Sequence, residues 1–308
     1  MSSDSSIVKN GYFSTGANVN IYWELHGQGI PLICCNGVGV STFFWKYITD
    51  NFKDRFQILL WDYRGHGKSQ RDFGTTIPDL SIKQHAQDLH ELYTHLFPAK
   101  PQVVLVGHSM GCQVLVEFYD QYPERTLSLI LMLGTVGKAL ETFGDNPHSK
   151  YYFRFAQKVV RRFGTRINKL IPPLIRSPLA WPFVHKLSIV DPLYTAKEDF
   201  LPYLTHLSSM NFILFLEAAW QCQIHDAWHT LPKITVPTLM VAGENDFFMP
   251  LHCAKKITQI IPKAELLVLA EGTHSAIIEQ PETINHRLER FFAEHLIVFE
   301  PPRQIASQ

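Results

Sequence analysis

A serine between two glycines is the feature of the sequence best suited to chemistry. Ser109 is the centre of the run GHSMG at positions 107–111, which follows a short apolar stretch. A strand that turns sharply into a helix leaves no room for side chains two positions on either side, which explains the two glycines. Such a turn exposes the hydroxyl at a helix N-terminus, where backbone N–H groups can stabilise an oxyanion. The segment predicts a strand, a nucleophilic serine and a helix.

A serine hydroxyl is a weak nucleophile, so this prediction requires a histidine base oriented by a carboxylate. Among fifteen histidines, His274 directly follows a predicted late strand, and Asp246 follows the strand before it. The carboxyl ends of parallel strands meet at one edge of a sheet, where open α/β sheets place their sites. We therefore expect His274 and Asp246 to lie near Ser109.

The elements that would position these residues are apolar runs alternating with helical patterns. The runs are typical of strands buried on both faces and span 30–35, 56–61, 102–106, 127–133, 238–242 and 265–269. The helical patterns between them span 42–51, 81–96, 110–122, 251–261 and 277–295. This alternation predicts an α/β fold with a mostly parallel, doubly wound sheet of about eight strands.

The alternation stops between residues 138 and 230, which contain long amphipathic and aromatic stretches. We expect these residues to form a helical cap, inserted into an α/β core of residues 1–137 and 231–300. Residues 301–308 are expected to form a flexible tail.

Together these features resemble the α/β-hydrolase superfamily, in particular serine esterases and lipases with a helical cap. The run GENDFFMP at 243–250 is similar to the family's G-x-x-D-x-x-x-P acid loop, with Asp246 at the carboxylate. His274 falls where the family's catalytic histidine follows the last strand. The resemblance implies a triad of Ser109, Asp246 and His274, with Glu244 as the alternative acid. His66 and His108 are alternative bases.

The same resemblance implies an oxyanion hole formed by the backbone N–H groups of Val38 and Met110. Family members often carry His-Gly where this chain has Asn36-Gly37, a difference that affects side-chain support of the loop but not its backbone donors. The run WDYRGHGKS at 61–69 is similar to the family's D-x-R-G-x-G-x-S loop, which organises the turn beneath the site.

Aromatic residues near the site and in the cap are candidates for binding a hydrophobic group. We expect Phe43, Phe44 and Trp45 to line an acyl pocket, although packing of the first helix would explain them equally well. Phe212 and Trp220 belong to the apolar part of the cap and are expected to line the same pocket.

Composition and motifs narrow the function classes. Lys+Arg and Asp+Glu balance at 28 each, so no overall charge attracts nucleic acid. HExxH, Walker and GxGxxG motifs are absent from the sequence, and we expect neither a metal nor a cofactor. The five cysteines form no CxxC pair, and the N-terminal run has no signal-peptide pattern, which favours a cytoplasmic location.

One segment of the cap departs from this charge balance. Residues 150–176 contain eight Lys or Arg residues and no acid, beside apolar residues that include Phe155 and Phe163. Two interpretations remain open. The segment is either a solvated lid whose apolar side covers the active-site cleft, or a peripheral contact with an anionic membrane.

The sequence thus predicts a serine hydrolase that cleaves carboxylic esters with a hydrophobic acyl or alcohol group. The alternatives are hydrolysis of a lactone or a C–C bond by the same triad, and a ligand receptor with a slow triad.

Overall fold

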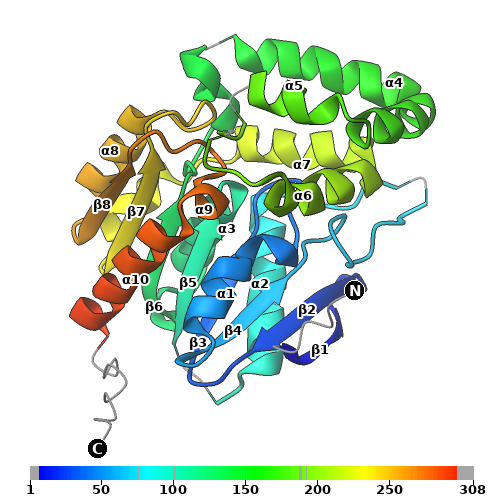
Figure 1. Cartoon of the computed structure of the whole chain (residues 1–308). Helices are drawn as coiled ribbons and strands as arrows, with labels where there is room; N and C mark the ends of the chain where they lie inside the picture. Colours follow the sequence, from blue (N-terminus) through cyan, green and yellow to red (C-terminus); the bar gives the residue numbers. More distant parts are fainter. Residues whose placement is uncertain are drawn as a thin grey trace, which may run out of the picture.

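One sheet of eight strands forms the centre of the molecule, with helices on both faces (Figure 1). The computed structural model describes residues 7–74, 76–99, 102–146, 148–186, 189–191 and 193–296, so the predicted tail at 301–308 lies outside the described residues. The strand order is β1-β2-β4-β3-β5-β6-β7-β8, and β3 to β8 are all parallel. The strands span β1 (Ile7–Ser14), β2 (Asn20–His26), β3 (Ile30–Cys35), β4 (Phe56–Trp61), β5 (Val103–His108), β6 (Thr126–Met132), β7 (Thr238–Gly243) and β8 (Ala264–Leu269). The predicted fold class is confirmed.

Alternating side chains of the central strands bury two separate clusters. Ile33, Leu59 and Leu105 face one side of the sheet, and Leu32, Ile58 and Val104 face the other. Helices α2 (Ile82–Leu96), α3 (Met110–Gln121) and α8 (Leu251–Ile260) cover the first side, and α1 (Lys46–Phe52) and α10 (Pro281–His295) cover the second. Because both faces are covered, the side chains of these central strands are largely apolar.

Strands β1 and β2 were not among the elements predicted individually. Strand β2 is antiparallel to both of its neighbours and contains two buried polar residues, Glu24 and His26. Burial raises the pKa of Glu24, but hydrogen bonds from His26 and Tyr22 and the charge of Lys68 together lower it to about 2. These polar residues interrupt the apolar pattern by which the other strands were recognised.

Residues 138–230, here called the cap segment, lie above the carboxyl ends of the strands (Figure 1). The segment contains α4 (Ser149–Ile175), α5 (Ala180–Lys186), α6 (Lys197–Ser209) and α7 (Phe212–Ile224), and no extended strand among its described residues. Its two ends are joined by an isolated antiparallel bridge between Gly137 and Asp226. None of the helices that the structure describes combines the length and apolarity needed to cross a lipid bilayer.

Candidate active site

The backbone at Ser109 makes the sharp turn that the sequence predicts. Ser109 lies between β5 and α3 with φ 55° and ψ −117°, a conformation that non-glycine residues rarely adopt. A Cβ on Gly107 would lie 2.7 Å from the carbonyl carbon of Gly111, and one on Gly111 would lie 2.1 Å from the Cys35 carbonyl oxygen. The two glycines are therefore required by close packing of the turn against itself and against the end of β3.

A chain of hydrogen bonds joins Ser109, His274 and Asp246. His274 Nδ1 lies 2.9 and 3.0 Å from the two carboxylate oxygens of Asp246, and His274 Nε2 lies 3.0 Å from Ser109 Oγ. A carboxylate can only accept, so Nδ1 carries the proton and the lone pair of Nε2 faces the serine hydroxyl. Asp246 is buried, and its Oδ1 also accepts hydrogen bonds from the backbone N–H groups of Phe248 and Met249 at 2.8 and 2.9 Å. The three side chains proposed from sequence are thus brought together in a geometry suited to proton transfer.

The alternative acid and bases lie in other environments. Glu244 is exposed and accepts a hydrogen bond from the backbone of Glu271 at 3.2 Å. His66 is buried beside the backbone of Arg64, and burial lowers its pKa to about 4. His108 is directed at the backbone carbonyl of His274, 3.0 Å from its Nε2. In this geometry none of the three takes the position that Asp246 or His274 occupies.

The loop after β3 runs directly beside the serine. A Cβ on Gly37 would lie 3.1 Å from that of Ser109, and Val38 lines the same cavity as Ser109 and Met110. Met110 is the first residue of α3, where backbone N–H groups have no partner within the helix. The amides of Val38 and Met110 are thus available near the serine.

Asn36 supports this loop through two side-chain hydrogen bonds. Its amide Nδ2 donates to the Trp61 carbonyl at 2.7 Å, and its Oδ1 accepts from Trp45 Nε1 at 2.6 Å. The side chain is fully buried, so both of its bonds are shielded from water.

The residues of the 61–69 run organise the structure around this loop. Asp62 accepts from the backbone N–H groups of Thr42 and Lys68, at 3.2 and 2.8 Å. Arg64 forms a buried bidentate pair with Asp88, at 2.6 and 2.8 Å. The predicted structural role of the run agrees with these contacts.

A cavity of about 310 Å³ opens at the serine and extends beneath the cap segment. Ser109, His274 and Val38 lie in its wall, which is otherwise largely apolar. Phe44, expected from the sequence, and Phe215 lie in this wall, and the further aromatic residues that line it were not predicted: Phe143, Phe153, Phe200, Tyr203 and Phe248. The cap residues among them, such as Phe153 and Phe200, have no motif, because packing decides which side of a cap helix faces inward.

Four of the aromatic residues expected to bind substrate do not line this cavity. Trp45 is fully buried in the core, where its Nε1 donates a hydrogen bond to Asn36. Phe43 lines a separate, smaller pocket. The Arg154 guanidinium lies over the Trp220 ring, with its Cζ 4.2 Å from the ring centroid. The ring centroids of Phe212 and Phe215 are 6.1 Å apart. The expectation for these four positions is corrected, and Phe44 and Phe215, close to Phe43 and Phe212 in sequence, lie in the wall instead.

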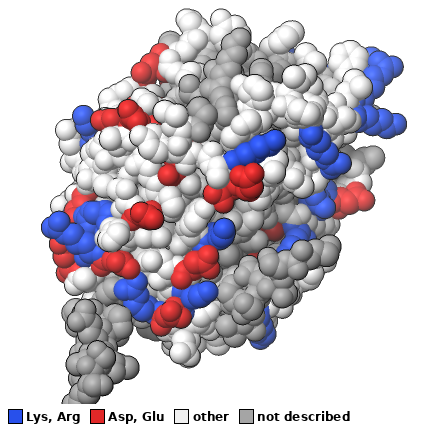
Figure 2. Space-filling view, viewed as in Figure 1, with Lys and Arg blue, Asp and Glu red and all other residues white. Residues whose placement is uncertain are grey.

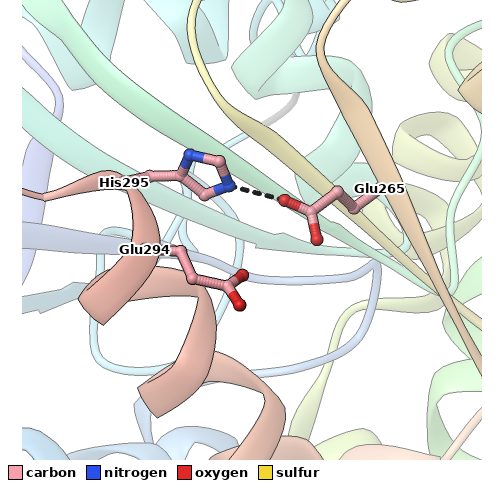
Figure 3. A group of neighbouring side chains, drawn as sticks. All are labelled: Glu265, Glu294 and His295. Carbon is pink, nitrogen blue, oxygen red and sulfur yellow. Dashed lines mark hydrogen bonds and ion pairs between the residues drawn. The ribbon is translucent and has the colours of Figure 1, made fainter.

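One group of side chains on the described surface has the composition of a metal site. Glu265, Glu294 and His295 lie close together at the C-terminal end of α10, and His295 Nε2 contacts Glu265 (Figure 3). The carboxylates of this group also pair with arginines, Glu265 with Arg287 and Glu294 with Arg290. Because these arginines already neutralise the carboxylates, the group is explained as a surface ion-pair network.

Comparison with known proteins identifies the family. The model of the alpha/beta hydrolase fold family matches residues 30–281. The chain belongs to the alpha/beta hydrolase fold family. The match includes the serine turn, the acid loop and the histidine loop, so the resemblance proposed from these motifs is confirmed.

Relatives and solved structures agree with this assignment. A putative carbamate hydrolase RutD of Azorhizobium caulinodans is 23% identical over 92% of this chain and 98% of its own length. The pimeloyl-[acyl-carrier protein] methyl ester esterase of Vibrio vulnificus is 20% identical over 89% of this chain and 98% of its own. A thermophilic esterase from Thermogutta terrifontis superposes with a TM-score of 0.70 at 23% identity, over 94% of this chain and all of its own. The names of these relatives support the prediction that the chain is a hydrolase enzyme.

Proposed function

We propose that this protein is a serine hydrolase of carboxylic esters, with Ser109, His274 and Asp246 as its catalytic triad. The hydrogen-bonded chain from Ser109 Oγ through His274 to Asp246 is the observation that carries the proposal. Ser109 Oγ attacks the ester carbonyl carbon while His274 Nε2 takes its proton, and Asp246 stabilises the resulting imidazolium. The amides of Val38 and Met110 hold the oxyanion of the tetrahedral intermediate.

His274 then returns the proton to the leaving alcohol, and the carbonyl–oxygen bond of the ester breaks. A water molecule, deprotonated by His274, attacks the acyl-enzyme and releases the acid and the free serine. His274 Nε2 thus accepts and returns the proton in both steps, so His274 and Ser109 act as one unit. Removal of both residues should therefore cost about as much activity as removal of either one.

The cavity supports a substrate with a hydrophobic group of modest size. Its volume of about 310 Å³ is at the lower end of the range for ligand pockets, and its wall is largely apolar. Esters with short or medium acyl chains should therefore be better substrates than palmitoyl esters. A carbamate has the same kind of carbonyl centre and is the second candidate, favoured by the name of the relative from Azorhizobium caulinodans.

Hydrolysis of p-nitrophenyl esters from acetate to palmitate, with a p-nitrophenyl carbamate in the same series, tests the proposal. In Ser109→Ala the turnover number should fall by at least about 10⁴-fold. Ser275→Ala is the matched control, because Ser275 lines the same cavity but bonds the Ile189 carbonyl, and it should retain activity. A fluorophosphonate should label the parent and the control but not Ser109→Ala.

The outcomes separate the alternatives. Sustained turnover by Ser109→Ala would exclude Ser109 as the nucleophile. A single acylation without turnover would indicate a receptor with a slow triad. Turnover of lactones or of substrates with a scissile C–C bond, but of no linear ester, would retain the triad and replace the substrate class.

We further propose a cytoplasmic location, which the buried free thiols of Cys34, Cys35, Cys112 and Cys222 support.

A further inference from the structure

An unusual number of apolar side chains is exposed along helix α4. Fifteen large hydrophobic residues of the described chain are exposed, and seven of them lie on this one helix. Phe155 and Leu170 are 71% and 70% exposed, among the highest values in the molecule. Contiguous exposed apolar surface of this kind marks an interaction site more often than scattered single residues do. The seven are Tyr151, Tyr152, Phe155, Val159, Phe163, Leu170 and Leu174.

These residues form a stripe directed away from the protein. Tyr152, Phe155, Val159 and Phe163 recur every three or four positions up to a kink at Phe163, and Leu170 and Leu174 are exposed on the part of α4 beyond the kink. The opposite side faces inward: Phe153 lines the cavity, Gln157 bonds Glu217 at 3.0 Å, and a Cβ on Gly164 would lie 2.5 Å from Ile213. The expected lid with its apolar side over the cleft is therefore only half right, because Phe155 and Phe163 face solvent.

Cations flank the stripe on one side. Lys158, Arg162, Arg166 and Lys169 are exposed, and none has an acidic partner among the described residues. Arg162 instead lies over the Phe163 ring, 5.5 Å from its centroid. Figure 2 shows Lys and Arg side chains projecting at the upper right, near the far end of α4, beside uncharged surface. We call the exposed apolar stripe together with these four cations the outer α4 face.

We propose that the outer α4 face docks on the surface of a bilayer that contains anionic phospholipids. Aromatic and leucine side chains bury in the boundary between headgroups and acyl chains, and Lys and Arg pair with lipid phosphates. No Asp or Glu occurs between positions 145 and 191, so nothing acidic in this stretch repels the lipid charge.

Charge and burial favour an anionic bilayer over two other partners, a second copy of the chain and a nucleic acid. A second copy of the chain, packed face to face, would place Lys158, Arg162 and Arg166 of both molecules against each other. Nucleic acid would satisfy the cations but would leave Phe155 and Leu170 in water. The docked orientation would also place the bilayer next to the helix that contributes Phe153 to the cavity wall.

Flotation with vesicles tests the proposal, with the full chain and equal mixtures of phosphatidylcholine and phosphatidylglycerol. The parent should float with these vesicles at low salt, should stay in solution with pure phosphatidylcholine, and should be released by high salt. The triple variant Lys158→Glu, Arg162→Glu, Arg166→Glu should bind about a hundredfold more weakly. Arg161 is left unchanged because it pairs with Glu217, which is largely buried.

Matched controls separate the face from net charge and from general hydrophobicity. Lys83→Glu, Lys255→Glu, Lys263→Glu makes the same charge change at exposed positions elsewhere and should still bind. Phe155→Ser with Leu170→Ser should lose binding with all cations intact, whereas Ile77→Ser with Leu201→Ser should keep it. Far-ultraviolet circular dichroism and urea unfolding of every variant check that it remains folded.

The proposal does not depend on the catalytic one, because Ser109→Ala should float as the parent does. The membrane proposal would be overturned if the parent did not float at low salt. It would also be overturned if the triple variant of the outer α4 face and the control triple variant weakened vesicle binding equally. A dimer in solution whose formation is abolished by Phe155→Ser with Leu170→Ser, without vesicle binding by the parent, would assign the face to a second copy instead.

Discussion

His108 donates a hydrogen bond from Nε2 to the backbone carbonyl of His274, over 3.0 Å. The carbonyl can only accept, so Nε2 of His108 carries a proton. Burial lowers the pKa of His108 to about 3, and the nearby His274 ring contributes to the shift. A residue adjacent to the nucleophile thus holds the backbone of the proposed base without adding a positive charge beside it.

Replacement of this donor should lower the turnover number. In His108→Leu the His274 loop loses its anchor, and we expect kcat to fall about ten- to a hundredfold with little change in KM for short esters. His286→Leu is the matched control, since His286 also lies 3.0 Å from a backbone carbonyl, that of Glu282, on the exposed side of α10. Equal kcat values for His108→Leu and the parent would show that the loop is held by other contacts.

The two bonds of Asn36 should make it important for stability. Asn36→Ala leaves the buried Trp45 Nε1 and the Trp61 carbonyl without their partner, and we expect the free energy of unfolding to fall by about 3 kcal/mol. Asn285→Ala removes the same side chain where it makes one bond of 3.3 Å to Tyr47, and the loss should stay below about 1 kcal/mol. Urea unfolding measures both. Similar losses in the two variants would contradict a special role for Asn36.

Two phenylalanines of α7 provide a sharp test of the cavity wall. Phe215 lines the cavity and Phe212, one turn earlier on the same helix, does not. Phe215→Ala should enlarge the cavity and move the preferred p-nitrophenyl ester to longer acyl chains, whereas Phe212→Ala should leave the preference unchanged. A shift in Phe212→Ala alone would mean that substrate binds along another surface of the cap segment.

Buried neutral histidines should make the fold sensitive to acid. Burial lowers the pKa of His206, on α6, to about 4, from 6.5 in the unfolded chain. Between these two values the unfolded state binds the extra proton, so stability falls as the pH drops below 6.5. Between pH 7.5 and 5.0 this one histidine should contribute about 2 kcal/mol of that loss, which His206→Gln should remove. Unfolding in urea at both pH values gives the difference, and an unchanged loss in the variant would refute the explanation.

Most of the parallel part of the sheet could be predicted because strands such as β3 and β5 are buried on both faces and are therefore short, largely apolar runs. The positions of Ser109, Asp246 and His274 followed from it, since residues after parallel strands meet at one edge. The cap segment differs. Helix α7 is apolar on nearly all sides, so nothing in its sequence distinguishes Phe215, which faces the cavity, from Phe212, which does not. Helix α4 was recognised as amphipathic, but only packing reveals that Phe155 faces water.

The bridge between Gly137 and Asp226 has a consequence for how this molecule can diversify. The backbones flanking the cap segment pair at this point, with Lys138 N–H bonded to the His225 carbonyl at 2.9 Å and Ala227 N–H to the Val136 carbonyl at 3.0 Å. The backbones that enter and leave the cap segment are therefore held together by their own hydrogen bonds, independently of the length of the chain between them. The catalytic loops, in contrast, do contact the segment: the Ile189 carbonyl accepts a hydrogen bond from Ser275, next to His274, and Thr142 Oγ1 donates to the Phe248 carbonyl in the acid loop. A change of helices within the segment that keeps this junction and these two contacts would therefore alter the cavity wall while leaving the strands and both catalytic loops in place.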